Sequence, residues 1–190
     1  MTLDKRTPHT SSAARDRILR TAHDLFYRDG VRATGIDRLI AESGVAKLTF
    51  YRHFPSKNDL VRAYLDYRHG EWMAWFFDAL ARYGGDPGAI VLAMEEWLRD
   101  PTYRGCAFIN SVGELPGVLP DIAEIARNHK EAMIAAIASV LPASPQRTKL
   151  AQAVALAIDG AIVRAQFDVT PDLALDTLKR IVKSLVKEQQ

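Results

Sequence analysis

The sequence has little cysteine and no long apolar run. Cys106 is the only cysteine in 190 residues, which excludes an internal disulfide framework and fits a reducing cytoplasm. No apolar segment approaches the roughly 20 residues that a membrane-spanning helix needs. Residues 1–16 also lack the apolar stretch of a signal peptide. The sequence therefore predicts a cytoplasmic protein that contacts no membrane.

Sequence signatures of enzymes are also missing. There is no P-loop, no GxSxG or HExxH motif, no nucleotide-binding glycine fingerprint and no cluster of Cys and His. We therefore expect no catalytic activity, no cofactor and no metal ion. Cys106 is expected to be a buried, inert thiol, because no Lys, His or second Cys stands beside it to lower its pKa. A redox-sensing thiol is the alternative.

Basic residues gather in the first part of the chain. Residues 1–69 contain 13 Lys and Arg against 8 Asp and Glu, whereas the remainder contains 12 basic and 15 acidic residues. This asymmetry is typical of a DNA-binding end joined to a body that does not bind DNA. We expect residues 1–11, with Lys5 and Arg6, to be a flexible basic tail. The alternative is an arm that touches DNA beside the main site.

The basic region has the pattern of a short helical unit. Apolar residues at i, i+4, i+7 and i+8 from Ile18 predict a helix from about Ser12 to Arg28. Residues 34–57 predict two further short helices around Gly44, because glycine adopts the left-handed conformation of a helix C-cap at low cost. The first of these two helices is expected to begin at a capping threonine.

The second short helix has one apolar and one polar face. Phe50 and Phe54 are four residues apart and are expected to enter the core. The opposite face carries Lys47, Leu48, Thr49, Tyr51, Arg52 and His53. Hydroxyls and cations on such a face reach phosphates and base edges, so the helix suits a major groove of DNA.

A larger pattern runs through this segment. Its members are Thr34, Leu39-Ile40, Gly44-Val45, Lys47, Thr49, Phe50-Tyr51-Arg52-His53-Phe54 and Lys57. With these residues the segment resembles the helix-turn-helix of the TetR (tetracycline repressor) family of bacterial transcription regulators. With the preceding helix, the match covers about a third of the chain, and the GCAFIN segment at 105–110 is similar to part of one branch of the family.

The resemblance implies roles for individual side chains. It implies phosphate contacts by Tyr51, His53 and Lys57 and, less strongly, by Thr34, which is also the expected helix cap with Asp37 three residues later. Base edges are expected to be read by Lys47, Leu48, Thr49 and Arg52.

Four positions depart from the family pattern. Ala46 stands where a capping Ser or Thr is usual, which removes one hydroxyl contact. Leu48 replaces a frequent glycine and suits contact with a thymine methyl, so the operator sequence does not transfer from relatives. Ile40 and Ser43 replace small alanines, which predicts a slightly different angle between the two helices.

The remainder of the chain predicts six more helices. The first is expected to begin at a cap formed by Ser56 and to run to about Tyr83, as a connector that transmits movement to the DNA-binding end. The others are expected at 88–99, 105–115, 121–141, 144–167 and 171–187. No segment alternates as a strand does. We therefore predict an all-α fold of about nine helices, with a helix-turn-helix DNA-binding domain over 12–55 and an effector-binding and dimerisation domain over 56–190.

The last two predicted helices are expected to form a homodimer. The first is rich in Ala and Gly, which let helices approach closely, and the second has more apolar residues than one core stripe needs. Residues 148–187 of two chains are therefore predicted to form a four-helix interface.

Aromatic residues of the body are candidates for an effector pocket, although most aromatics in such positions belong to a core. The ligand-binding candidates are Trp72, Trp75, Trp97, Phe108, Asn110 and Phe167. Glu114, His129 and Arg164 are further polar side chains that suit orienting a ligand, with His129 expected on a helix surface. Many aromatics and few charges predict an apolar or aromatic effector.

These expectations combine into one functional hypothesis. The chain is expected to be a homodimeric repressor that binds a near-palindromic operator in double-stranded DNA and is released by a small molecule. The alternative is a helical bundle that binds a small molecule, or an enzyme, without specific DNA binding. An activator, or a regulator without a ligand, fits the same sequence.

Overall fold

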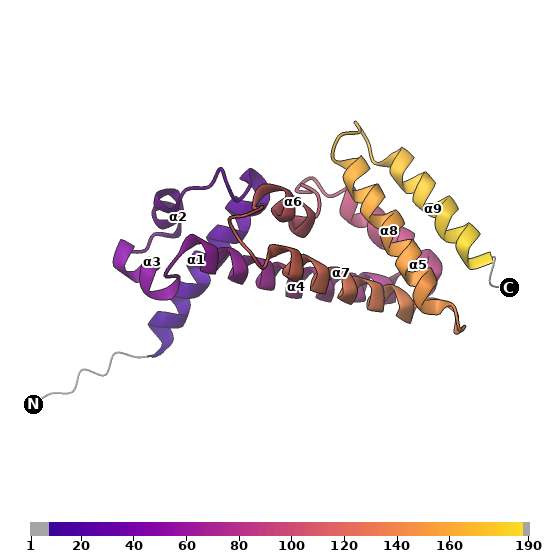
Figure 1. The fold of residues 1–190 in the computed structure, drawn as a ribbon, viewed down its shortest axis with the longest axis horizontal. Helices are drawn as coiled ribbons and strands as arrows, with labels where there is room; N and C mark the ends of the chain where they lie inside the picture. Colours follow the sequence, from indigo (N-terminus) through magenta and orange to yellow (C-terminus); the bar gives the residue numbers. More distant parts are fainter. Residues whose placement is uncertain (1–7, 188–190) are drawn as a thin grey trace, which may run out of the picture.

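The fold is an elongated assembly of helices, seen in a computed structural model that describes residues 8–187, with side chains from residue 13 onward (Figure 1). The described residues form nine α-helices and no strand, which confirms the predicted all-α class. The helices are α1 (Pro8–Asp29), α2 (Ile36–Ser43), α3 (Lys47–His53), α4 (Lys57–Arg82), α5 (Pro87–Leu98), α6 (Ala107–Glu114), α7 (Ile122–Ser139), α8 (Arg147–Ala165) and α9 (Asp172–Lys187).

Helices α1, α2 and α3 form one end of the molecule (Figure 1). The apolar stripe of α1 is buried, and Leu39 of α2 and Phe50 of α3 pack with it and are fully buried. Gly44 ends α2 with φ 62° and ψ 33°, the left-handed conformation that the sequence predicts. A residue with a Cβ is disfavoured there, so this glycine fixes the tight turn into α3.

Two sequence expectations fail at this end. Thr34 does not cap α2: Gly35 occupies the N-cap without a side-chain hydrogen bond, and the Thr34 hydroxyl instead donates to the Gly30 carbonyl at 2.8 Å. Helix α1 also begins at Pro8, earlier than the expected Ser12, so residues 8–11 extend the helix. The expected basic tail otherwise falls on residues 1–7, with Lys5 and Arg6, which lie outside the described residues.

Helix α4 runs along most of the molecule and joins the two ends (Figure 1). Its start is the predicted one: the Asp59 amide donates to the Ser56 hydroxyl at 3.1 Å, and that hydroxyl donates to the Asp59 carboxylate at 2.7 Å. Because a capped N-terminus fixes the first turn, α4 begins within a few residues of the end of α3. The unit and the body are thus connected without a flexible linker.

Helices α5 to α9 build the body with the second half of α4. The Asp86 carboxylate caps α5, and α8 packs between α7 and α9. Buried Ala151, Val154 and Ile158 line one side of α8, whereas Leu156 on another side is 74% exposed. The helix therefore has apolar residues on more sides than its own chain covers. None of the described helices is both long and apolar enough to cross a membrane.

Polar contacts from the α6 region hold the unit formed by α1 to α3 against the body. Before α6, the Tyr27 hydroxyl donates to the Gly105 carbonyl at 3.0 Å. At the end of α6, a Glu114 carboxylate oxygen accepts from the Arg32 amide at 2.9 Å. After α6, Arg62 of α4 forms two hydrogen bonds to the Asp121 carboxylate, at 2.8 and 2.9 Å. The segment around α6 therefore touches both α1 and the start of α4.

Candidate DNA-binding surface and ligand cleft

Helix α3 presents a polar face to solvent because its apolar face is anchored. Phe50 is fully buried and Phe54 is 2% exposed, so the opposite side of this two-turn helix points outward. Leu48 is 74% exposed and Tyr51 37% exposed, and Lys47 and Arg52 are also exposed. Thr49, His53 and Lys57 are half-buried. The structure thus leaves seven of the eight candidate DNA contacts at least partly exposed to solvent.

Thr34 is the exception among these candidates. Its side chain is fully buried and its hydroxyl is engaged with the Gly30 carbonyl, so it is not available to a phosphate. The residue holds the turn between α1 and α2 in shape. The sequence pattern identifies Thr34 as a residue of this turn, but it does not show whether the hydroxyl faces solvent or the backbone.

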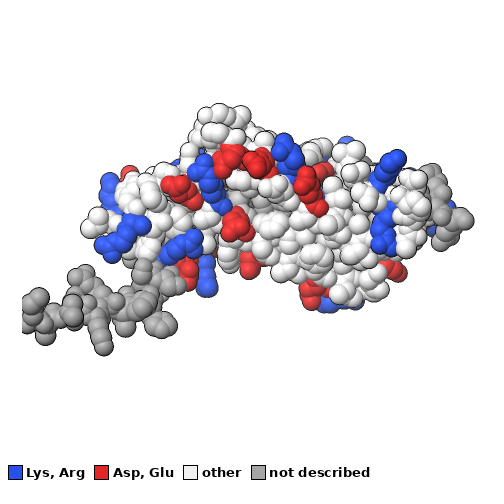
Figure 2. Space-filling view, turned by 60° about the horizontal axis from the view of Figure 1, so that its bottom comes forward, with Lys and Arg blue, Asp and Glu red and all other residues white. Residues whose placement is uncertain are grey.

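The electrostatics of this end suit a polyanion. Figure 2 shows Lys and Arg side chains over the end that carries α1 to α3, with acidic side chains mainly toward the middle of the molecule. Lys57 lies at the edge of this surface. Partial burial lowers the pKa of its amine below the usual value, and the nearby Glu114 carboxylate opposes this shift. Lys57 therefore has a carboxylate neighbour in the body as well as access to solvent.

A cleft of about 610 Å³ lies between α1, the middle of α4 and the end of α5. Trp72, Trp75 and Trp97 line it, as three of the ligand-binding candidates. Its volume is in the range of small-molecule sites. Charged residues also line this cleft, which differs from the expectation of a pocket with few charges. They are Asp24, Arg28, Arg68, Glu71, Glu96, Asp100 and Arg104.

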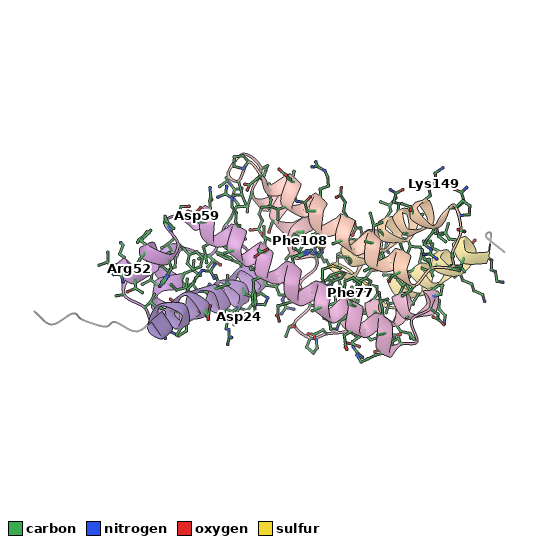
Figure 3. The ribbon with its side chains drawn as sticks, turned by 90° about the horizontal axis from the view of Figure 1, so that it is seen from below. Asp24, Arg52, Asp59, Phe77, Phe108 and Lys149 are labelled. Carbon is green, nitrogen blue, oxygen red and sulfur yellow. The ribbon has the colours of Figure 1, made fainter. Side chains whose placement is uncertain are left out.

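The other three ligand candidates lie elsewhere. Phe108 is buried behind the cleft and lines a small inner cavity with Trp72 and Trp97 (Figure 3). The Asn110 amide donates to the Arg104 carbonyl at 2.9 Å, outside the residues that line the cleft. Phe167 is 66% exposed at the end of α8, where the Arg164 guanidinium lies 5.3 Å from its ring centre. The last two therefore do not line the cleft.

His129 is not on a helix surface, contrary to the sequence expectation. It is 3% exposed and stacks on Phe108 with the ring centres 3.8 Å apart. Its Nδ1 lies 3.1 Å from Nδ1 of His69 on α4. Burial, with Lys130 and His69 nearby, lowers the pKa of His129 to about 3. The side chain is thus a neutral part of the core between α4, α6 and α7.

Two further residues of the cleft were not singled out by the sequence. The Arg68 guanidinium lies 4.2 Å from the centre of the Tyr27 ring, and a guanidinium nitrogen lies 3.4 Å from Nε2 of His23. Arg68 is on α4 and Tyr27 on α1, 41 positions apart. No local spacing reports such a contact, because it depends on how two long helices cross. Among the described residues, no group of three or more His, Cys, Asp and Glu is arranged to hold a metal ion.

Helices α8 and α9 lie at the far end of the molecule from α3 (Figure 1), and both carry exposed apolar residues. A groove of about 320 Å³ runs between the two helices, and Ala157, Gly160, Leu173 and Ile181 are among the residues that line it. Leu156, on the same helix as Ala157, is also exposed. This surface is the one that the sequence predicts as a dimer interface.

Together, a tight glycine turn, an anchored short helix with an exposed polar face and a separate helical body define a helix-turn-helix transcriptional regulator. Comparisons with known proteins give the family. Residues 18–64 match the family described as bacterial regulatory proteins, tetR family. This match assigns residues 18–64 to the DNA-binding region of TetR-family transcriptional regulators.

Individual relatives agree with this assignment. The structure is similar to that of a TetR-family transcriptional regulator from Streptomyces coelicolor, with 28% identity, a TM-score of 0.81, and coverage of 93% of this chain and 96% of that chain. The reduced form of NemR from Escherichia coli has the same fold, with 20% identity, a TM-score of 0.75, and coverage of 88% and 96%.

A curated relative matches over a shorter length. It is an uncharacterised helix-turn-helix transcriptional regulator from Lactococcus lactis, 26% identical over 112 residues, which are 56% of this chain and 57% of the relative. The chain thus spans little more than half the length of this curated relative.

Proposed function

We propose that the protein is a homodimeric transcriptional repressor that binds a near-palindromic operator and is released from it by a small molecule. The observation that carries the proposal is the orientation of α3. Phe50 and Phe54 hold one face of this helix in the core, so Leu48, Tyr51 and Arg52 stand in solvent on the other. A helix anchored in this way can enter a major groove without unfolding its own core.

The exposed side chains divide into two groups by their chemistry. Tyr51, His53 and Lys57 contact phosphates and set the position of the unit on the duplex, in our proposal. The second group reads base edges and sets the operator sequence, and it consists of Lys47, Leu48, Thr49 and Arg52. Thr34 belongs to neither group, because its side chain is buried.

The dimer is proposed to form through residues 148–187, which include most of α8 and all of α9. Leu173 is 53% exposed and lines the apolar groove, and Leu156 is 74% exposed on α8. A second copy of this surface would bury these side chains in a four-helix bundle. Two α3 helices would then enter successive major grooves about one helical turn apart.

The proposed division of the chain is the one that the sequence predicts. Residues 12–55 bind DNA, and residues 56–190 bind the effector and dimerise. The effector is an apolar or aromatic small molecule that occupies the cleft beside Trp72, Trp75 and Trp97. A ligand that releases DNA must bind the conformation with the weaker operator affinity, and α4 links the cleft to the DNA-binding end.

The proposal includes no catalytic activity and no cofactor, and it places the protein in the cytoplasm with its operator. The known relatives described above are transcriptional regulators, which supports this part. Salt-dependent binding to one specific duplex separates the proposal from a helical bundle that binds only a small molecule.

The experiment measures binding of the purified protein to fluorescent duplexes from the region upstream of its own gene, by anisotropy against a scrambled duplex. We expect tight binding to one duplex that weakens steeply with salt. Thr49→Ala or Arg52→Ala should relax the sequence preference, at about 1–3 kcal/mol per lost base contact. Equal affinity of the wild-type protein for the scrambled duplex and every upstream fragment would contradict the proposed operator recognition.

A further inference from the structure

The lining of the cleft has spare hydrogen-bond donors. Trp72 is 6% exposed, and its indole Nε1–H is the one buried side-chain nitrogen or oxygen, among the described residues, without a hydrogen-bond partner. A buried donor left unpaired destabilises the folded state. A ligand that brings an acceptor to this nitrogen would remove that destabilisation.

Arg68 supplies a second donor group. Its described contacts are the face of the Tyr27 ring and Nε2 of His23, and no described carboxylate pairs with it. The side chain is half-buried and lines both the cleft and the small inner cavity, as do Trp72 and Trp97. Arg68 therefore lies between the cleft and the small inner cavity, and most of its guanidinium N–H groups have no described hydrogen-bond partner.

The other two arginines of the cleft differ from Arg68. Arg28 donates two hydrogen bonds to the Asp29 carboxylate, both at 2.9 Å. Arg104 donates to the carbonyls of Pro101 and Tyr103. Arg68 is thus the cation of this cleft that lacks both a carboxylate and a carbonyl partner.

The acceptors of the cleft are largely occupied or exposed. Glu96 accepts hydrogen bonds from Trp75, Arg82 and Tyr83, which lower the pKa of its carboxyl. Asp100 accepts from the amide and the hydroxyl of Thr102, at 2.7 and 2.6 Å. Asp24, Glu71 and Asp100 are exposed side chains. The cleft therefore has unpaired donors but few free buried acceptors, so a ligand that supplies hydrogen-bond acceptors fits it best.

From this balance we infer that the cleft binds an aromatic monocarboxylate, with its ring against the tryptophans and its carboxylate between Arg68 and the Trp72 indole N–H. A planar carboxylate matches the fork of a guanidinium. The ring packs against the cluster of Trp72, Trp75 and Trp97, whose ring centres lie 5.4–6.2 Å apart. One unpaired arginine fits one negative charge, and the exposed acids around the cleft disfavour a dianion such as a phosphate ester.

This inference rests on the proposed function only in taking the cleft as the effector site, and it is tested without DNA. The probe is 2-naphthoate, and its neutral counterpart is 2-naphthalenemethanol, which keeps the two rings. Calorimetric titration of the full chain should show at least tenfold tighter binding of the naphthoate. Arg68→Gln should reduce this preference to less than twofold, because the neutral amide pairs more weakly with a carboxylate.

Two further variants make the result specific. Trp72→Phe keeps an aromatic ring but removes the indole N–H, and it should weaken naphthoate binding at least threefold. Arg127→Gln is the matched control, since Arg127 is exposed on α7 and lines neither the cleft nor the α8–α9 groove. It should leave both affinities unchanged. Circular dichroism and thermal melting establish that each variant is folded, and Trp72→Phe replaces Arg68→Gln as the decisive variant if the latter does not fold.

Three results would overturn the inference: no binding of 2-naphthoate by the wild-type protein, binding no tighter than that of the alcohol, or a full naphthoate preference in a folded Arg68→Gln variant. These failures are distinguishable from failure of the proposed repressor function. Operator binding without naphthoate binding would remove the ligand class alone. Naphthoate binding without any specific duplex would support the site and contradict the repressor.

Discussion

At the residue scale, Lys57 and Tyr51 support a direct prediction about DNA. Lys57 is the first residue of α4 and Tyr51 is exposed on α3. Because phosphate contacts carry no sequence information, Tyr51→Ala and Lys57→Ala should weaken binding to all duplexes alike. Loss of one charged phosphate contact in Lys57→Ala should also reduce the salt slope by about one. Anisotropy titrations at several salt concentrations measure both effects.

Lys149 provides the matched control for this prediction. It is an exposed lysine on α8, at the opposite end of the molecule from Arg52 (Figure 3). Lys149→Ala removes the same charge and should leave the affinity and the salt slope unchanged. If Tyr51→Ala and Lys57→Ala bind as the wild-type protein does, the assigned DNA-binding face is wrong.

His129 makes stability depend on pH. Its folded-state pKa of about 3 lies below the ordinary value of 6.5. Between these two values the unfolded chain binds more protons, so stability rises with pH and is lost as pH falls below about 6.5. Between pH 7 and pH 5 the loss should be about 2 kcal/mol, at 1.36 kcal/mol for each pKa unit. Urea unfolding at the two pH values measures it.

The charged neighbours of His129 support the direction of this effect. Lys130, His69 and Arg68 all disfavour a positive charge on the His129 imidazole. His129→Phe keeps a flat ring against Phe108 and should make unfolding less sensitive to pH over this range. His53→Gln, on the surface of α3, is the control and should retain the wild-type dependence. An unchanged pH dependence in His129→Phe would disprove the assignment.

At the scale of elements, Tyr27 joins α1 to the segment before α6. Its hydroxyl donates to the Gly105 carbonyl and accepts from the Arg104 amide, at 3.0 and 3.1 Å. Tyr27 also lines the cleft and supports Arg68. Tyr27→Phe should therefore preserve 2-naphthoate binding within about threefold. It should reduce the effect of the ligand on operator affinity several-fold, from coupling that is typically 5–150-fold.

Tyr103→Phe is the matched control, because the Tyr103 hydroxyl donates to the Ile162 carbonyl at 2.6 Å, within the body. Tyr103→Phe loses a comparable hydrogen bond but leaves the hydrogen bond between Tyr27 of α1 and Gly105 in place. The measurement is the ratio of operator affinities with and without 2-naphthoate. An undiminished ratio in Tyr27→Phe would rule out this link as the route of the signal.

The elements themselves were largely predictable from sequence, because their ends are local features. The Ser56 cap and the Gly44 turn involve atoms within a few residues, and both occur as expected. Helix α4 ends at Arg82, one residue from the predicted end. Thr34 shows the limit of such reasoning. Its hydroxyl could cap α2 or donate to the Gly30 carbonyl, and both are local options between which packing selects.

At the scale of the whole molecule, the apolar groove between α8 and α9 supports a prediction about assembly. Ala157 is half-buried in this groove beside Gly160. If a second chain covers the groove, Ala157→Glu buries an unpaired charge, which costs several kcal/mol. We expect monomers or insoluble chains and loss of operator binding. Light scattering and anisotropy measure the two results.

Ala123→Glu is the control for the charge itself. Ala123 is an exposed alanine on α7, away from the α8–α9 groove. This variant should assemble and bind DNA as the wild-type protein does. A dimeric Ala157→Glu protein with unchanged DNA affinity would exclude the groove as the interface.

The sequence by itself determined the helical class, the order and approximate positions of the helices and the DNA-binding segment. Each of these depends on periodicity, caps and turns within one stretch of chain. The tertiary structure decided which side chains face one another across helices. It buried Thr34 and His129, kept Phe167 out of the cleft and brought Arg68 onto Tyr27. The physical reason is that burial and pairing depend on how distant helices cross, and the local spacing of residues carries no record of that crossing.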